Sequence, residues 1–255
     1  MIVLTCISDT ENPGYKLLLK SCDYFGLNLK TLYNEGGWKS HRLKDFHVNK
    51  YLRTLNPNEI VLFTDGYDTM FVSGEEEILK KYDAIGGSVV FSTETNCFPH
   101  EAHRLEYGVG ETKFQYLNSG GYIGTVSALL SLFDKFDAML SSGILSENNY
   151  RMSNQYLWTK LYLLNRKDIR LDYHCSIFQT FVNRIDILRK PQMSNVYLEE
   201  INTVLDDFYI EKNKLYNVVT GSTPSHLHFN GVLFKNLIKT GVLDGIIPWK
   251  EEVNS

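Results

Sequence analysis

Two aspartates three residues apart, Asp65 and Asp68, have the types and spacing to do chemistry together. They follow residues 60–64, an apolar and β-branched run that is typical of a strand buried on both faces. A strand that ends in acids places them at the carboxyl edge of a sheet, where open α/β folds bind ligands. Both carboxylates could then share one hard cation, because Mg²⁺ and Mn²⁺ prefer oxygen ligands. The alternative is a structural Asp-Gly turn in which Asp68 caps the next helix.

The elements that lead to these acids predict a βαβαβ unit. Strands are expected at residues 2–8, 27–32 and 60–64, with helices at about 15–25 and 41–55 between them. This order is typical of a nucleotide-binding parallel sheet, in which right-handed crossovers bring the ends of the first and third strands to one edge. We therefore expect an α/β fold with a Rossmann-like, mostly parallel central sheet flanked by helices.

The remainder of the chain continues the same domain. Residues 74–77 open a helix, strands are predicted at 88–93, 176–180 and 225–231, and helices at 126–140, 154–164 and 232–239. Residues 95–114 form a longer stretch than a structural connection needs, which favours a lid or an acceptor loop. The paired glycines within 116–124 would let a ligand or another backbone approach closely. Because no internal repeat or linker interrupts the pattern, we predict a single domain over residues 1–255.

Composition narrows the classes of partner. Hydrophobic residues make up 43% and charged residues 22%, which suits a folded core, and a net charge of -4 without a long basic run argues against nucleic acid. The four cysteines are scattered, which favours a reducing compartment. No window approaches the ~20 apolar residues of a membrane span, and residues 1–7 lack the features of a signal peptide. We expect a soluble, cytoplasmic protein without membrane contact, or a module of a larger secretory one. Its aromatic-rich loops could serve a homodimer.

Six motifs occur in an order and at a spacing that resemble one family. They are residues 61–71 (VLFTDGYDTMF), 90–94 (VFSTE), 97–99 (CFP), 117–124 (LNSGGYIG), 177–179 (IFQ) and 228–231 (HFNG). Together they resemble the N-terminal glycosyltransferase domain of the multifunctional procollagen lysyl hydroxylases, from about residue 2 to residue 238. The sequence looks like a stand-alone form of that domain, such as a giant DNA virus would carry, without the oxygenase domain.

The resemblance implies a GT-A fold and an enzyme that transfers a sugar from a UDP-sugar. The expected reaction moves glucose from UDP-glucose to galactosyl-hydroxylysine of collagen or a collagen-like protein, with Mn²⁺ and with retention of configuration. Residues 1–94 would form the nucleotide-sugar-binding half and residues 95–255 the acceptor-side half. A UDP-galactose-dependent hydroxylysine galactosyltransferase is a close alternative, because the two sugars differ in one hydroxyl orientation. A nucleotide-sugar binding module without turnover is an alternative of another class.

By the same resemblance, Asp65, Asp68 and His228 would be the metal ligands, the histidine belonging to the half that follows residue 94. Two carboxylate oxygens and one imidazole suit Mn²⁺, which accepts nitrogen more readily than Mg²⁺ does. His226 has the same parity on the predicted strand and could be the ligand instead. A core histidine at position 228 is the structural alternative.

Donor-binding roles are expected for Cys6, Ser8, Trp38, Lys39, Thr64, Tyr67, Gly120, Asn230 and Gly231, of which the resemblance implies Trp38, Lys39, Tyr67, Asn230 and Gly231. Tyr67 would stack near the uracil or ribose, or else simply pack at the turn. An exposed tryptophan in a glycine loop is hard to explain as core, so Trp38 is expected to belong to a lid over the donor. Lys39 is either a phosphate contact or a solvated loop lysine, and the last two residues of the set would lie near the diphosphate.

Three further residues, Glu94, Asn118 and Asn154, are implied beside the transferred sugar. Asn154 departs from the family pattern, which has an aspartate there, and its amide keeps the hydrogen bonds but not the charge. A retaining transfer can use a carboxylate nucleophile, for which Glu94 is the candidate, or a front-face displacement in which the leaving phosphate helps to deprotonate the acceptor. The sequence leaves both mechanisms open, and Asn154 favours the second because it removes one possible nucleophile.

Overall fold

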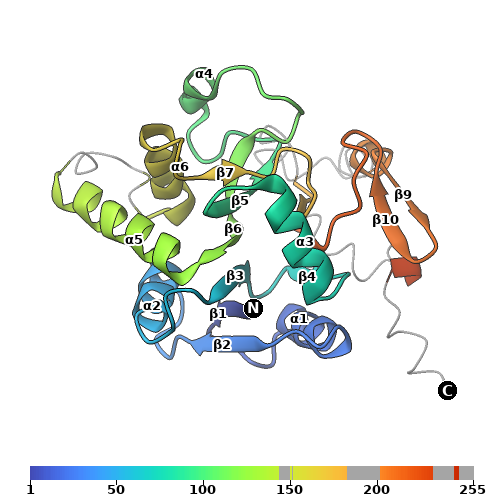
Figure 1. Ribbon diagram of the computed structural model, residues 1–255, viewed down its shortest axis with the longest axis horizontal. Helices are drawn as coiled ribbons and strands as arrows, with labels where there is room; N and C mark the ends of the chain where they lie inside the picture. The colour runs from blue at the N-terminus through green and yellow to red at the C-terminus, as the bar shows by residue number, and fades with distance from the viewer. Residues whose placement is uncertain (144–149, 151, 183–201, 232–243, 247–255) are drawn as a thin grey trace, which may run out of the picture.

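A six-stranded sheet forms the centre of the molecule. The computed structural model describes residues 1–143, 150, 152–182, 202–231 and 244–246. The strand order is β2-β1-β3-β6-β5-β7 (Figure 1), with β1 Ile2–Ile7, β2 Leu29–Tyr33, β3 Ile60–Asp65, β5 Val89–Glu94, β6 Tyr116–Thr125 and β7 Arg170–Leu171. Neighbouring strands are parallel except at β6, which runs antiparallel to both β3 and β5. The predicted mostly parallel sheet is therefore confirmed.

Helices cover both faces of this sheet (Figure 1). One face carries α2 (Arg42–Leu52), α5 (Val126–Ser141) and α6 (Asn154–Leu164), and the other carries α1 (Pro13–Tyr24) and α3 (Glu75–Ile85). Strand β3 shows the alternation, because Val61 and Phe63 pack in the first layer and Leu62 in the second. Burial on both faces explains why this strand is apolar throughout. Among the described residues, no helix combines the length and the apolar character needed to cross a membrane.

A second, three-stranded sheet lies beside the first and completes the site. Its order is β4-β11-β8, with β4 Thr69–Phe71, β8 Phe178–Thr180 and β11 His226–His228. The remaining elements are η1 Glu101–His103 and α4 Arg104–Tyr107 within the long stretch after β5, the hairpin of β9 Phe208–Glu211 and β10 Lys214–Asn217, and η3 Asp244–Ile246. Strand β4 follows β3 after a short turn, so the small sheet is tied directly to the end of the central strand.

Several boundaries differ from the sequence-based predictions for local reasons. Helix α1 begins two residues earlier than predicted, because Pro13 occupies its first turn and the Asn12 side chain accepts a hydrogen bond from the Gly14 amide. Residues 116–125 form the long strand β6. No strand was predicted here, only paired glycines that would let a ligand or another backbone approach closely. The predicted strand over 225–231 is confirmed in part as β11, and the helix predicted at 232–239 lies outside the described residues.

The core on the α2, α5 and α6 face is built around Trp158. This side chain is fully buried and its ring contacts Phe91, Tyr122, Phe133 and Phe136. Replacing Trp158 with alanine is expected to lower the free energy of unfolding by ~3–5 kcal/mol, through lost burial and the cavity left behind. Chemical denaturation measures this change.

The matched control for that substitution is Leu164→Ala, on the same helix but with a side chain that is 63% exposed. It should change the free energy of unfolding by only about 0.5 kcal/mol or less. Equal effects of the two substitutions would contradict the assignment of this core.

Candidate active site

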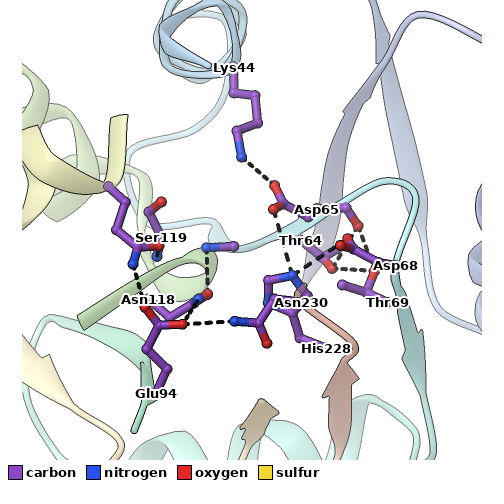
Figure 2. A network of polar contacts seen from close by, with 12 residues as sticks. Lys44, Thr64, Asp65, Asp68, Thr69, Glu94, Asn118, Ser119, His228 and Asn230 are labelled. Atoms are coloured by element: carbon purple, nitrogen blue, oxygen red, sulfur yellow. Dashed lines mark hydrogen bonds and ion pairs between the residues drawn. The ribbon is translucent and has the colours of Figure 1, made fainter. Parts of the chain in front are cut away.

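The two aspartates and one histidine meet at the end of the central strand. Asp65 ends β3, Asp68 closes the turn before β4, and His228 ends β11. Strand pairing fixes the histidine, because His228 lies opposite Thr69, the residue after Asp68. Its Nε2 atom is 3.5 Å from Asp68 Oδ1 and 3.8 Å from Asp65 Oδ2 (Figure 2). One ligand atom from each residue lies within 4.8 Å of the others, so the three can hold one metal ion.

Burial and charge prepare this group for a cation. Burial lowers the pKa of His228, but Asp68 and Asp65 outweigh that effect and the pKa is raised overall. The two carboxylates therefore make the surroundings of the imidazole negative, and such surroundings favour a bound cation. Two carboxylate oxygens and an imidazole nitrogen that converge in this way fit Mn²⁺. His226, the alternative ligand, is fully buried behind the group with its Nε2 2.7 Å from Thr64 Oγ1, and it is not part of the cluster.

Glu94 is the centre of a second polar cluster in the same place (Figure 2). Its Oε2 atom accepts hydrogen bonds from Asn118 Nδ2 at 3.2 Å and Asn230 Nδ2 at 2.8 Å, and its Oε1 atom accepts one from Gln155 Nε2 at 2.6 Å. Burial raises the pKa of Glu94 to about 7, although these three amides act in the opposite sense. Because all three partners are donors, the surroundings are built for the ionised carboxylate, which only accepts.

A cavity of about 280 Å³ joins the two clusters, near the lower end of the ~300–1,000 Å³ typical of ligand pockets. The predicted residues that line it are Asp65, Asp68, Glu94, Asn118, Gly120, Asn154, His228, Asn230 and Gly231. They come from the ends of β3, β5 and β11, from the turn after β3, from the first half of β6, from the segment after β11 and from the start of α6. The fold therefore brings residues from both predicted halves of the chain into one cavity.

The other six predicted residues lie away from that cavity. Cys6 and Thr64 are buried in the protein interior, and burial raises the pKa of the Cys6 thiol to about 12. The Tyr67 hydroxyl accepts a hydrogen bond from the Ser8 amide at 2.6 Å, so these two fasten the loop after β1 to the turn after β3.

In the glycine loop, Lys39 is exposed, whereas Trp38 is half-buried against the main core and is not the exposed side chain that was expected. The nucleotide-binding roles of all six residues outside the cavity stay predictions.

Eight residues that line the cavity were not predicted, among them Lys44, Ser119 and Gln155. Lys44 is buried on α2 with its Nζ 2.6 Å from Asp65 Oδ1. Burial would lower the pKa of Lys44, but Asp65 holds it above its usual value, so the side chain stays charged. The sequence could have indicated that Lys44 is buried and paired, because Lys44 shares a helix face with Val48 and a charged residue on a buried face needs a partner.

The first glycine of the predicted pair has a steric reason to be glycine. A Cβ atom at Gly120 would lie 2.2 Å from His228 Cε1 and 2.9 Å from Asp65 Oδ2. The side chain that approaches Gly120 most closely is thus that of His228. We call Asp65, Asp68 and His228 the metal group, because together they can hold one metal ion. We expect Gly120→Ala to displace His228 and to weaken Mn²⁺ binding on the order of 10–100-fold, as loss of support around a metal ligand does. Calorimetric titration with Mn²⁺ measures the change.

Gly36→Ala is the matched control, because a Cβ atom at Gly36 would meet nothing within 4 Å. This variant should bind Mn²⁺ like the unmodified protein, and both variants should keep the far-ultraviolet circular dichroism of a folded protein. Unchanged Mn²⁺ affinity in Gly120→Ala would show that His228 is not a ligand.

The architecture can be compared with solved structures. One described as a crystal structure of a glycosyltransferase involved in the glycosylation of the major capsid of PBCV-1 aligns with a TM-score of 0.52 at 10% identity, covering 94% of this chain and 98% of the other. This likeness concerns the fold alone. A mostly parallel sheet with an Asp-Asp-His group beside the carboxyl end of its central strand, together with this likeness, defines the fold as GT-A.

Sequence comparison then gives the family. Residues 1–241 match the family described as the PLOD GT domain, and the chain belongs to that family of glycosyltransferases. Procollagen-lysine,2-oxoglutarate 5-dioxygenase 1 of Bos taurus is 29% identical over 215 residues, which are 77% of this chain and 27% of that protein. An uncharacterized protein of Acanthamoeba polyphaga mimivirus is 28% identical over 182 residues, 71% of this chain and 33% of that protein. The chain thus spans about a third or less of these relatives' length.

Proposed function

We propose that this protein transfers glucose from UDP-glucose to galactosyl-hydroxylysine of a collagen or collagen-like acceptor, with Mn²⁺ and with retention of configuration. The observation that carries the proposal is the meeting of Asp65, Asp68 and His228 with the Glu94 cluster in one cavity. A metal group alone would serve many reactions. A metal group beside a buried carboxylate and several amides matches a donor whose diphosphate is charged and whose sugar carries hydroxyl groups.

The metal group is assigned to the diphosphate. Asp65, Asp68 and His228 would hold Mn²⁺, which when bound supplies Lewis-acid neutralisation of the leaving diphosphate. Lys44 adds a fixed positive charge on the same side of the cavity. A cation held in a largely buried position is well placed to bind phosphate oxygens, because the low local dielectric strengthens the attraction.

The Glu94 cluster is assigned to the sugar. Asn118, Gln155 and Asn230 hold the carboxylate at fixed positions, and the carboxylate oxygens can accept hydrogen bonds from sugar hydroxyls or face the anomeric carbon. Asn154 and Ser119 continue this polar wall along the cavity. Both a covalent route through Glu94 and a front-face displacement fit these positions. We favour the front-face route, because Asn154 removes one possible nucleophile.

The acceptor proposal rests on what the relatives are called. The name procollagen-lysine,2-oxoglutarate 5-dioxygenase describes proteins that act on procollagen lysine, and this chain matches about 27% of such a protein. A UDP-galactose-dependent transfer to hydroxylysine is the second candidate. Asn154 stands where the family pattern has an aspartate, and it therefore changes the charge on the side of the cavity that is assigned to the sugar.

A UDP-release assay tests the proposal. Four reactions pair UDP-glucose or UDP-galactose with a peptide that carries galactosyl-hydroxylysine or hydroxylysine, each with Mn²⁺ and with EDTA. We expect UDP release with UDP-glucose and the galactosylated peptide, and none in EDTA. Release only with UDP-galactose and hydroxylysine would replace the donor and acceptor but keep the reaction class. Metal-dependent UDP-sugar binding without release in any pairing would identify a binding module and overturn the proposed activity.

A further inference from the structure

A buried carboxylate lies behind the wall of the cavity without lining it. Asp45, on α2, is only 6% exposed. Its Oδ1 atom accepts a hydrogen bond from the indole Nε1 of Trp158 at 2.9 Å, while its Oδ2 atom is buried and accepts no hydrogen bond of ordinary length. The side chain of Asn154, the first residue of α6, interacts with the same carboxylate. Among the residues that line the cavity, Asp45 therefore interacts with Asn154 and, through its charge, with Lys44.

An ionised Asp45 would favour one of the two orientations of the Asn154 amide. Burial raises the pKa of Asp45 to about 6, against the opposing effects of Trp158, Lys44 and Asn154, so the carboxylate is mostly ionised at neutral pH. An ionised carboxylate only accepts hydrogen bonds, and it therefore favours the NH₂ end of the amide over the oxygen end. The other end, Oδ1, is 3.4 Å from Ser119 Oγ, which also lines the cavity.

We propose that Asp45 is a positioning residue, which orients the Asn154 amide so that its oxygen is offered to a hydroxyl of the donor sugar. The inference rests on the proposed function, because it takes this wall of the cavity to be the sugar side. In this arrangement, Asn154 offers the same acceptor oxygen that an aspartate would. The negative charge is carried instead by Asp45, which lies behind Asn154.

The arrangement also explains why an asparagine suits position 154. An aspartate there would place two carboxylates next to each other in a buried setting, and like charges at that range cannot both ionise without a large cost. One of them would hold a proton, and the acceptor oxygen would no longer be fixed. The inference thus predicts that Asn154→Asp weakens the site instead of restoring it.

A reciprocal exchange tests this inference. Asn154→Asp and Asp45→Asn, each alone, should lower kcat/KM for UDP-glucose on the order of 10–100-fold, the range seen when a partner behind a site residue is lost. The double variant again has one carboxylate and one amide, so it should recover to within about threefold of the unmodified protein, a strong departure from additivity. A double variant as poor as the product of the single variants, or a fully active Asn154→Asp, would overturn the inference.

Asp134→Asn is the matched control, because it makes the same chemical change on an exposed carboxylate that pairs with Arg53. It should leave kcat/KM unchanged.

Calorimetry keeps the inference separate from the proposed activity. If the unmodified protein shows no turnover, the ratio of its affinities for UDP-glucose and UDP, in Mn²⁺, is compared across the four proteins. The same ratio in all four would overturn the role of Asp45. A ratio lost in both single variants and regained in the double variant would support it.

Discussion

Replacing Asp68 with asparagine is expected to reduce UDP-sugar turnover by ~10³-fold or more. The amide keeps the shape of the side chain but removes one of the two negative charges that face His228 Nε2. A metal ion contributes several kcal/mol to charge stabilisation in reactions of this kind, and each 1.36 kcal/mol corresponds to about tenfold in rate. The rate of UDP release at saturating Mn²⁺ measures the effect.

The control for Asp68→Asn is Asp83→Asn, an exposed aspartate on α3 away from the cavity. It should retain full turnover. If Asp68→Asn kept more than about a tenth of the activity, where loss of metal chemistry predicts about a thousandth, the metal role of this residue would be wrong.

Glu94→Gln is expected to lower turnover by about 10²–10³-fold, the effect of losing one strong electrostatic group at the reacting centre. Glutamine has nearly the same size, but its NH₂ group would face donors, because Asn118, Gln155 and Asn230 all donate to this position. At least one of these hydrogen bonds is then lost. Single-turnover kinetics with UDP-glucose measure the change at the chemical step.

Glu94 should also govern the pH dependence. Its pKa, raised to about 7 by burial, predicts activity that rises with pH and reaches half its maximum at or below pH 7, since a bound cation would lower the midpoint. The folded protein holds this proton more tightly than the unfolded chain, whose glutamates titrate near ~4.3. The contribution of Glu94 to stability therefore falls as pH rises from about 4 to 7. Glu94→Gln should flatten both profiles over this range. An unchanged activity profile would exclude Glu94 as the titrating group.

Local patterns predicted much of the fold. The apolar run of β3 and the βαβαβ order before it follow from burial on both sheet faces, and α5 and α6 from their helical periodicity. Strand β6 was not predicted, because its two adjacent glycines disfavour a strand. The structure accepts them because the register of β5 shifts between Phe91 and Ser92, which leaves residues 119–121 without partners on that strand. Only tertiary packing supplies that information.

The site was predictable where chemistry shows in the sequence. Asp65 and Asp68 follow a buried strand, and His228 was placed by resemblance; the structure brings all three together. Spacing could not separate His228 from His226, because strand parity is the same, whereas the pairing of β11 with β4 puts only His228 beside the acids. Lys44 and Asp45 were not predicted, because their partners are at least 20 residues away in sequence and meet them only in the folded protein.

The most direct test is a calorimetric titration of the protein with UDP-glucose in Mn²⁺, in EDTA, and in Mn²⁺ with the Asp68→Asn variant. In the proposed function, Asp65, Asp68 and His228 bind the donor diphosphate through a divalent ion. We therefore expect binding in the first titration and a loss of affinity of about 10²-fold or more in the other two, as when a charge-neutralising ion is removed. Equal affinity in Mn²⁺ and in EDTA would contradict the account, because the nucleotide sugar would then bind without the metal group.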